Sequence, residues 1–243
     1  MDLRTAFWQK LFAKSAAADA ENEQNIYTIH GWEVRTREFS ILLDRKIKAG
    51  RFKACFCAAD LGCGSAWYSR KLSSAGLRVM ALDLSAEMLA AAKEKKGSEA
   101  VGFCRADCCV LPFRDHSFDL VLSVGAICIV EDPQSFLSEI SRVLKPGGEL
   151  IIVALNRAYS GRLLSGIFSK RRIPPDISTR GYTPFELRDE LSKFMDFQEL
   201  EITPLYILPR CLRPLEILLQ RSSFFRLPAW RLASAFMVSG HIR

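Results

Sequence analysis

Hydrophobic residues along the chain follow two different spacings. Near the amino terminus they recur every three or four positions, as in an amphipathic helix, which predicts helices over residues 1–20 and 32–49. From about residue 54 onward, short continuous apolar runs alternate with helical stretches. The predicted strands cover 54–59, 77–82, 101–105, 118–124 and 149–155, and the predicted helices cover 66–75, 85–95 and 133–144. Alternation of this kind is typical of βαβ units and predicts a parallel sheet.

The last third of the chain has a less regular pattern. Thr183, Pro184 and Glu186 supply an N-cap, a proline at the first helical position and a capping-box glutamate, so a helix is predicted to begin there. Further strands are predicted over 197–208 and 232–242. We therefore expect an N-terminal helical cover, a central core and a C-terminal part of the same domain, with the bounds 1–50, 51–156 and 157–243.

A glycine-rich loop follows the first predicted strand. Asp60 ends the strand, and Gly62 and Gly64 come next, where glycine lets the backbone pass close to a ligand. Asp83 ends the following strand, 23 residues after Asp60, where a carboxylate can bind both hydroxyls of a ribose. Dehydrogenases that use a nicotinamide cofactor require a third glycine at position 67, which is Trp67 here. The sequence therefore favours a nucleoside-containing ligand but disfavours a dehydrogenase.

Ligands of parallel sheets bind beyond the carboxyl ends of the strands. Four polar residues end or follow predicted strands in this chain: Asp60, Asp83, Asp107 and Ser123. Taken singly, each carboxylate has an ordinary structural explanation. Asp60 could cap the turn after it, Asp83 could be a favourable charge at a helix N-terminus, and Asp107 could be a loop residue.

The order of the short motifs is more specific than any one of them. The segments are DLGCG (60–64), ALDLSAEML (81–89), ADC (106–108), LPF (111–113), SFDLV (117–121) and RVLKPGG (142–148). Together they resemble the class I S-adenosylmethionine-dependent methyltransferases, in particular the small-molecule group that includes the quinone-biosynthesis C-methyltransferases. The resemblance covers roughly residues 54–155, and its one departure is Ser65-Ala66, where many members have a third glycine at the second position.

The resemblance implies a fold, a cofactor and a set of contacts to the methionine end of that cofactor. The implied fold is a doubly wound, Rossmann-like α/β sheet of seven strands, mostly parallel with an antiparallel last strand. The implied cofactor is S-adenosylmethionine, with Asp60 facing its amino group and the backbone of Gly62 and Gly64 holding the methionine portion. Further contacts near the transferred methyl group are expected from Ser123, Val124 and, in the N-terminal cover, Tyr27.

The resemblance also implies contacts to the adenosine end. Asp83 would bind the ribose hydroxyls, and Leu84 and Met88 would flank the adenine ring. Asp107 would accept a hydrogen bond from the adenine amino group, and Cys108 would offer its backbone N–H.

No residue is an obvious general base. His116 is expected to be solvated in a polar turn, and His241 is near the end of the chain. His30 lies in the N-terminal cover, which often touches the substrate in members of the family that the chain resembles, so it is the candidate. A base is not obligatory, because the sulfonium is already an activated methyl donor and alignment of the reactants supplies much of the rate. Only a carbon acceptor or an oxygen of high pKa demands one.

The eight cysteines suggest two interpretations. Cys55 and Cys57 would point to the same face of a strand, where they could share a metal ion. The chain has no C-x₂-C pair, however, and histidines are few, so we expect small buried thiols and no metal site.

Composition adds the location of the charge. The chain has 243 residues, 49% of them hydrophobic, and a formal net charge of +7. Residues 1–156 carry 20 basic and 19 acidic residues, whereas 157–182 and 203–243 each carry six basic and one acidic. We expect two substrate-lid segments, 157–182 and 205–230, in which arginines are interleaved with leucine, isoleucine and phenylalanine.

Such basic and apolar segments suit an anionic membrane surface or an apolar, anionic small molecule. No secretory signal peptide or membrane span is evident, which predicts a cytoplasmic protein with peripheral membrane contact. The sequence hypothesis is a methyltransferase acting on a small, apolar or anionic, lipid- or quinone-like molecule. The alternatives are an RNA methyltransferase of the same fold, with nucleic acid the less favoured partner, and a non-catalytic cofactor-binding regulator.

Overall fold

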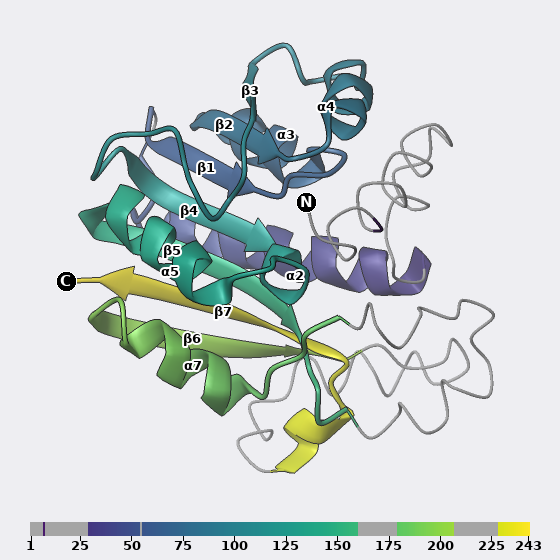
Figure 1. Ribbon diagram of the computed structural model, residues 1–243, viewed down its shortest axis with the longest axis vertical. Coiled ribbons are helices and arrows are strands. Elements are labelled where there is room, and N and C mark those ends of the chain that lie inside the picture. The colour runs from purple at the N-terminus through teal and green to yellow at the C-terminus, as the bar shows by residue number, and fades with distance from the viewer. Residues whose placement is uncertain (1–6, 8–28, 54, 160–178, 207–227) are drawn as a thin grey trace.

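The computed structural model describes Phe7 and residues 29–53, 55–159, 179–206 and 228–243 of the chain (Figure 1). These residues form one seven-stranded sheet with helices on both faces. The strands are β1 (Cys57–Leu61), β2 (Arg78–Asp83), β3 (Val101–Arg105), β4 (Phe118–Val124), β5 (Leu144–Leu155), β6 (Phe197–Leu205) and β7 (Ala235–Ile242). The helices are α2 (Ile29–Lys48), α3 (Trp67–Ser74), α4 (Ala86–Lys93), α5 (Pro133–Val143) and α7 (Pro184–Ser192), with short 3-10 helices η1 (Ala126–Cys128) and η4 (Pro228–Leu232).

The strand order is β3-β2-β1-β4-β5-β7-β6. Strands β1 to β5 pair in parallel, whereas β7 runs antiparallel to both of its neighbours, β5 and β6. The expected doubly wound sheet with an antiparallel last strand is therefore confirmed. The order of the strands reverses between β1 and β4, and ligands of open α/β sheets bind at such a switch point.

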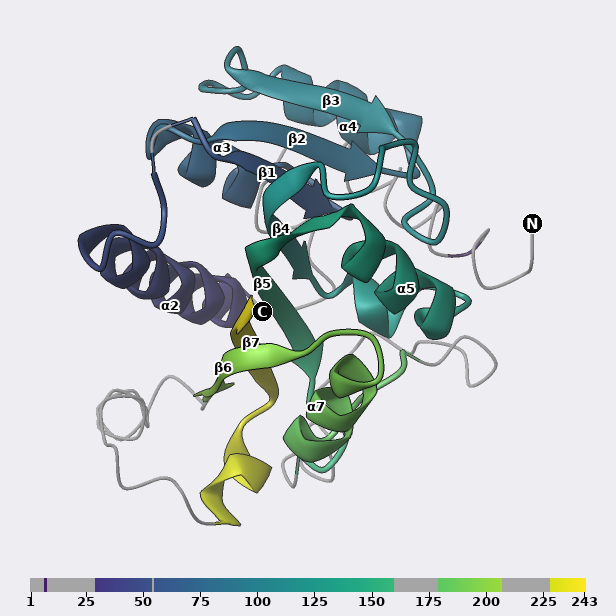
Figure 2. The same cartoon turned by 90° about the vertical axis from the view of Figure 1, so that its left-hand side faces the viewer.

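Side-chain alternation along the central strands divides the core into two layers. Ala59 and Leu61 of β1 face the layer that contains α5 and α7, whereas Ala58 faces the layer that contains α2, α3 and α4. Figure 2 shows α5 and α7 on one side of the sheet and α2 on the other. Because both faces are covered, the central parallel strands are mostly apolar, and their polar residues do not follow a regular alternation.

Capping residues set the starts of three helices. Ser85 accepts a hydrogen bond from Met88 N at the start of α4, and Asp132 accepts bonds from the first amides of α5. Thr183 and Glu186 form the complete capping box predicted for α7. Each cap satisfies backbone N–H groups that have no partner inside their own helix.

Helix α2 lies along the sheet with a direction that its contacts define. Near its carboxyl end, Lys46 forms an ion pair with Glu149 at the amino end of the regular pairing of β5. Near its amino end, Trp32 packs edge-on against Trp67, 5.8 Å between ring centroids, just after the glycine-rich loop. The amino end of α2 therefore lies beside the carboxyl edge of the sheet.

Several predicted strand boundaries are wrong: β6 ends at Leu205 rather than 208, β7 begins at Ala235 rather than 232, and β1 and β5 begin at other residues than predicted. The first strand begins at Cys57, because Cys55 has a φ of +70° and lies outside the strand. As a result, Cys55 and Cys57 do not share a strand face. The fifth strand begins at Leu144 rather than at the predicted residue 149, so residues 145–148 are part of β5, although Gly147 has a φ of +73° within it.

Several predicted features lie outside the described residues, and two others concern a membrane span and a metal site. The predicted helix over residues 1–20 and most of the two expected lid segments lie outside the described part of the chain. Among the described residues, no helix is long and apolar enough to cross a membrane, and no group of three or more potential metal ligands gathers.

Candidate active site

The carboxyl ends of β1 and β4 meet at the switch point of the sheet. Ser123, fully buried in β4, donates its hydroxyl to the Leu61 carbonyl of β1 at 3.2 Å. Gly62 follows at once and lies against η1, where an added Cβ would stand 2.8 Å from the Ala126 Cβ. The chain thus packs so closely at this point that only glycine fits.

The glycine-rich loop is held in place by the neighbouring strand. The amides of Gly62 and Cys63 both donate to the Leu82 carbonyl, each at 2.8 Å. Gly62 and Gly64 have φ angles of +73° and +52°, in the left-handed region that favours glycine. Ala66, where many relatives have a third glycine, has a φ of +56°, so this position keeps the left-handed backbone at a steric cost of about 1–2 kcal/mol.

Asp83, at the end of β2, joins two loops of the site. One carboxylate oxygen accepts a hydrogen bond from Gly64 N at 3.0 Å, and the other accepts one from Ser85 N at 2.9 Å. Burial raises the pKa of this carboxyl, and the backbone N–H donors oppose that rise. A carboxylate has about four acceptor positions, so Asp83 keeps capacity for the hydroxyl groups of a ligand.

Asp60 is the buried acid of the site. Its side chain is 1% exposed and accepts a hydrogen bond of 2.5 Å from the hydroxyl of Ser69, in α3. Burial raises the pKa of Asp60 to about 7, Ser69 lowers it, and the nearby Asp83 raises it further. Its carboxyl group therefore changes charge near neutral pH.

A second buried polar pair lies next to Asp60. Tyr68, at the start of α3, is packed beneath Phe39 of α2 and has its pKa raised by burial to about 12. The buried guanidinium of Arg35, from α2, opposes this rise. This arrangement places a positive charge from the helical cover in the vicinity of Asp60.

The loop after β3 carries the next two predicted residues. Asp107 is exposed, and one of its carboxylate oxygens accepts a hydrogen bond from Cys109 N at 2.8 Å. Cys108 is buried, and burial raises the pKa of its thiol, as it does for Cys63 in the glycine-rich loop. Both thiols therefore stay protonated, which makes them poor nucleophiles.

The apolar residues predicted to flank an adenine lie at the start of α4. Leu84 is partly exposed between Asp83 and the N-cap Ser85. Met88 is 1% exposed, and its Cε would lie 3.6 Å from a Cβ added at Gly64. Val124, at the end of β4, is partly exposed.

The remaining predicted residues are only partly placed. Tyr27 lies outside the described residues. His30 belongs to the first turn of α2, whose amino end lies beside the carboxyl edge of the sheet. By contrast, His116 precedes β4 and His241 pairs with Glu149, so both lie at the opposite edge.

The cysteines in the described part of the chain are all free thiols. Cys57 lies beside Arg78, and Cys109 donates weakly to the Asp132 carbonyl. The prediction of buried thiols is confirmed for three of them, Cys63, Cys108 and Cys128. It is wrong for the exposed Cys55 and for the partly exposed Cys57, Cys104 and Cys109.

Sequence reasoning missed the supporting residues of this site. Ser69, Ala126 and the polar part of Tyr68 have no local motif that marks them, because each meets its partner only through the folded sheet. Ser85 was detectable as an N-cap, since a serine after a strand and before an apolar helix is a helix start signal.

The donor set fits S-adenosylmethionine. Asp83 can accept from ribose hydroxyls, Asp107 can accept from an amino group, and the partly exposed Leu84 presents apolar surface, whereas Met88 is buried. Gly62 lies too close to Ala126 for a side chain, so at this residue only backbone atoms face the switch point. Asp60 supplies a carboxyl group near the end of β1, where the amino group of a methionine would need an acceptor.

Comparison with known proteins gives the same result for the core. Residues 59–152 match the family model described as a methyltransferase domain. The malonyl-[acyl-carrier protein] O-methyltransferase of Erwinia billingiae is 36% identical over 127 residues, which are 52% of this chain and 49% of that protein. The demethylmenaquinone methyltransferase of Renibacterium salmoninarum is 35% identical over 102 residues, 42% of each protein. The matched stretch thus spans half or less of the length of these relatives.

Among solved structures, an S-adenosylmethionine-dependent methyltransferase from Mesorhizobium loti has a TM-score of 0.57. It is 21% identical and covers 79% of this chain and 94% of its own, so it shows the fold. Residues 59–152 therefore match the methyltransferase domain family, and the chain has the fold of the S-adenosylmethionine-dependent methyltransferase from Mesorhizobium loti.

Proposed function

We propose that this protein is an S-adenosylmethionine-dependent methyltransferase that acts on a small, apolar or anionic molecule of lipid- or quinone-like character. The observation that carries the proposal is the Asp83 carboxylate, which ties the glycine-rich loop to the start of α4. This arrangement fixes a ribose-binding carboxylate before any ligand arrives, and preorganisation of this kind lowers the cost of binding.

When bound, the cofactor supplies a methyl group on a positively charged sulfur. The residues of the chain hold it: Asp83 at the ribose, Asp107 and Cys108 N at the adenine, and Asp60 at the amino group. The backbone of the glycine-rich loop would lie along the methionine portion, with Ser123 and Val124 near the methyl group. Catalysis then depends mainly on alignment of the acceptor with the methyl–sulfur bond.

We infer that His30 is the candidate general base if the acceptor needs one. Its place in the first turn of α2 is at the carboxyl edge of the sheet, where the cofactor would bind. His116 and His241 lie at the opposite edge and are too far along the strands to reach an acceptor there. An acceptor with an acidic hydroxyl would not need this residue.

The acceptor class is supported by aromatic side chains at the same edge of the sheet. Phe185, at the start of α7, is 51% exposed and packs edge-on against Trp230 at 5.6 Å. Arg188 and Arg231 lie over these two rings. Leu232, 44% exposed, extends the apolar surface. Such a surface suits an apolar molecule that also carries negative charge.

The relatives point in the same direction by their names, which specify a demethylmenaquinone and a malonyl-[acyl-carrier protein] as substrates. For this chain we propose only a small, apolar or anionic acceptor, together with peripheral contact with an anionic membrane surface.

The first experiment is calorimetry with S-adenosylmethionine and S-adenosylhomocysteine. Wild-type protein is expected to bind both, and Asp83→Ala is expected to bind neither measurably. Asp196→Ala is the matched control, because Asp196 pairs with Arg243 on an exposed surface away from the site. Absence of binding by the wild type, or unchanged binding by Asp83→Ala, would contradict the proposal.

The acceptor is identified by activity. The protein is incubated with methyl-labelled cofactor and with separate lipid, polar-metabolite and RNA fractions of an extract. Label in the lipid fraction is expected, with co-sedimentation on vesicles containing anionic lipid that weakens as salt is raised. Label in RNA would instead support an RNA methyltransferase. Cofactor binding with no product in any fraction would support a non-catalytic regulator.

A further inference from the structure

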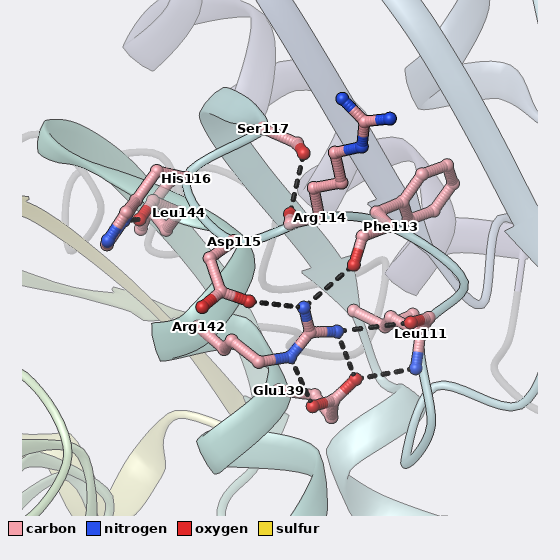
Figure 3. A network of polar contacts seen from close by, with 9 residues as sticks. All are labelled: Leu111, Phe113, Arg114, Asp115, His116, Ser117, Glu139, Arg142 and Leu144. Atoms are coloured by element: carbon pink, nitrogen blue, oxygen red, sulfur yellow. Dashed lines mark hydrogen bonds and ion pairs between the residues drawn. The ribbon is translucent and has the colours of Figure 1, made fainter.

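One arginine anchors the loop between β3 and β4 to helix α5. All five N–H groups of Arg142 have partners, shown in Figure 3. Two bonds go to the carboxylate of Glu139, one turn earlier on α5, each at 2.7 Å. The other three go to the Phe113 carbonyl at 2.7 Å, the Asp115 carboxylate at 2.8 Å and the Leu111 carbonyl at 3.1 Å.

Arg142 and Glu139 together hold both backbone polar groups of Leu111. The Leu111 N–H donates to Glu139 at 2.6 Å, and the Leu111 carbonyl accepts from Arg142. The hydrogen bonds between the two side chains lower the pKa of Glu139 and raise that of Arg142, so the pair favours the charged form of both groups. The side chain of Leu111 is buried, so the loop is fixed by packing and by this pair at the same residue.

Leu111 lies only four residues after Asp107, the predicted acceptor for the adenine amino group. Between them, Cys109 N donates to the Asp107 carboxylate, Val110 N donates to the Asp107 carbonyl, and Cys108 is buried. The turn that orients the Asp107 carboxylate is therefore short and has one end attached to Leu111. A shift of Leu111 would be passed to Asp107 through this turn.

We propose that Arg142 is a positioning residue for recognition of the cofactor's base. It acts through Leu111 and the turn at Asp107, and its guanidinium does not itself touch the cofactor. This inference rests on the proposed function, in which Asp107 accepts a hydrogen bond from the adenine amino group.

A purely structural anchor makes a different prediction from a positioning residue. Loss of an anchor lowers the free energy of unfolding and weakens the binding of every ligand at the carboxyl edge of the sheet by the same factor. Loss of a positioning residue also changes the preference between two ligands that differ only at the base. The test therefore compares S-adenosylhomocysteine with S-inosylhomocysteine, which carries a carbonyl oxygen in place of the adenine amino group.

Affinities of both ligands are measured by calorimetry for the wild type and for Arg142→Met. The wild type is expected to prefer S-adenosylhomocysteine by about tenfold or more, the value of one hydrogen bond to a charged acceptor. In Arg142→Met the preference is expected to fall to about twofold or less, because a misplaced acceptor no longer distinguishes the bases. Arg243→Met, which removes an arginine paired with Asp196 on an exposed surface away from the site, is expected to keep the full preference.

Two further variants separate this role from folding. Arg142→Lys keeps a positive charge beside Glu139 but loses the planar guanidinium that donates to the Leu111 and Phe113 carbonyls. Its preference for S-adenosylhomocysteine over S-inosylhomocysteine should therefore also fall. In Asp107→Ala the preference should be lost, and adding Arg142→Met should lower it no further. Thermal unfolding of each variant shows whether it is folded, and Arg142→Lys replaces Arg142→Met if the latter is not.

Each outcome is decisive. If the wild type binds neither ligand, the proposed function fails. If the wild type binds both ligands equally, Asp107 does not distinguish the two bases, and the positioning role of Arg142 is contradicted. If the wild type discriminates and folded Arg142 variants discriminate just as well, Arg142 is only an anchor and the inference is overturned.

Discussion

Acidic residues have different surroundings in the parallel and antiparallel parts of the sheet. At the carboxyl edge of β1 to β3, acidic side chains are buried or bonded to backbone N–H groups, as at Asp60 and Asp83. Around β6 and β7, acidic side chains form exposed ion pairs, such as Arg45–Glu201 and Arg243–Asp196. The first arrangement keeps charge ready for a ligand, whereas the second joins the surface of one element to another.

Burial is the physical difference between these two regions. Removal from water raises the pKa of Asp60 to about 7, whereas Glu190, beside Lys193 on the surface, has its pKa lowered by that pairing. Exposed ion pairs contribute little to stability because water screens them and the side chains lose freedom. We therefore expect substitutions at the carboxyl edge to have large effects and those around β6 to have small ones.

The largest expected effect is on stability and comes from Gly62→Ala. Its Cβ would stand 2.8 Å from that of Ala126 at a φ of +73°, so steric strain and overpacking should together lower the free energy of unfolding by about 3 kcal/mol. Gly147→Ala is the matched control, with the same φ of +73° but no atom within 4 Å of the added Cβ. It should cost about 1 kcal/mol. Chemical denaturation measures both, and equal losses would contradict the close approach.

The second effect is on binding. Replacing Asp83 by asparagine keeps the side-chain size but removes the charge and one hydrogen-bond acceptor. The affinity for S-adenosylhomocysteine, measured by calorimetry, should therefore fall about 30-fold or more. Asp196→Asn, in the exposed pair with Arg243, should leave the affinity unchanged. A similar loss in both variants would show that the two regions do not differ in function.

The third effect is a dependence on pH. A carboxylate must be ionised to attract an ammonium group, and Asp60 has a pKa of about 7 without ligand. Affinity for S-adenosylhomocysteine should therefore rise about tenfold between about pH 6 and about pH 8. Titration calorimetry across this range measures the slope, and Asp60→Asn should flatten it. An equally steep slope in Asp60→Asn would assign the titration to another group.

The same group gives a linked effect on stability. Because the folded-state pKa of Asp60 lies above its ordinary value of 3.8, the folded protein holds this proton more tightly than the unfolded chain. Its contribution to the free energy of unfolding should fall as pH rises from about 4 to about 7 and stay level above that. Denaturation at several pH values with wild type and Asp60→Asn isolates this contribution as the difference between the two proteins.

The smallest effect is expected around β6. Arg45→Met breaks the pair with Glu201, whose side chains are 53% and 45% exposed, and should change the free energy of unfolding by about 0.5 kcal/mol or less. Cofactor affinity should not change. A loss above about 1 kcal/mol would mean that the ion pairs of α2 with β6 hold the helical cover more firmly than exposed pairs usually do.

The regular elements could be predicted because their signals are local. The apolar runs at 101–105 and 118–124 match β3 and β4 at both ends, and the capping box at Thr183 and Glu186 starts α7 as expected. Two of the errors came at Cys55 and at residues 145–148, where the backbone conformation depends on neighbouring strands. Residue type alone did not reveal that Lys145 to Gly148 would continue a strand.

The sequence by itself determined the alternation of strands and helices, the glycine-rich loop and the positions of the three carboxylates that follow strands. These features depend on residues close together in the chain. Only the tertiary structure decided that Ser69 bonds Asp60, that Ala126 leaves no room at Gly62, and that Arg142 holds the loop of Asp107. These contacts join segments that are distant in sequence, and burial between them, rather than residue type, sets their charge and their strength.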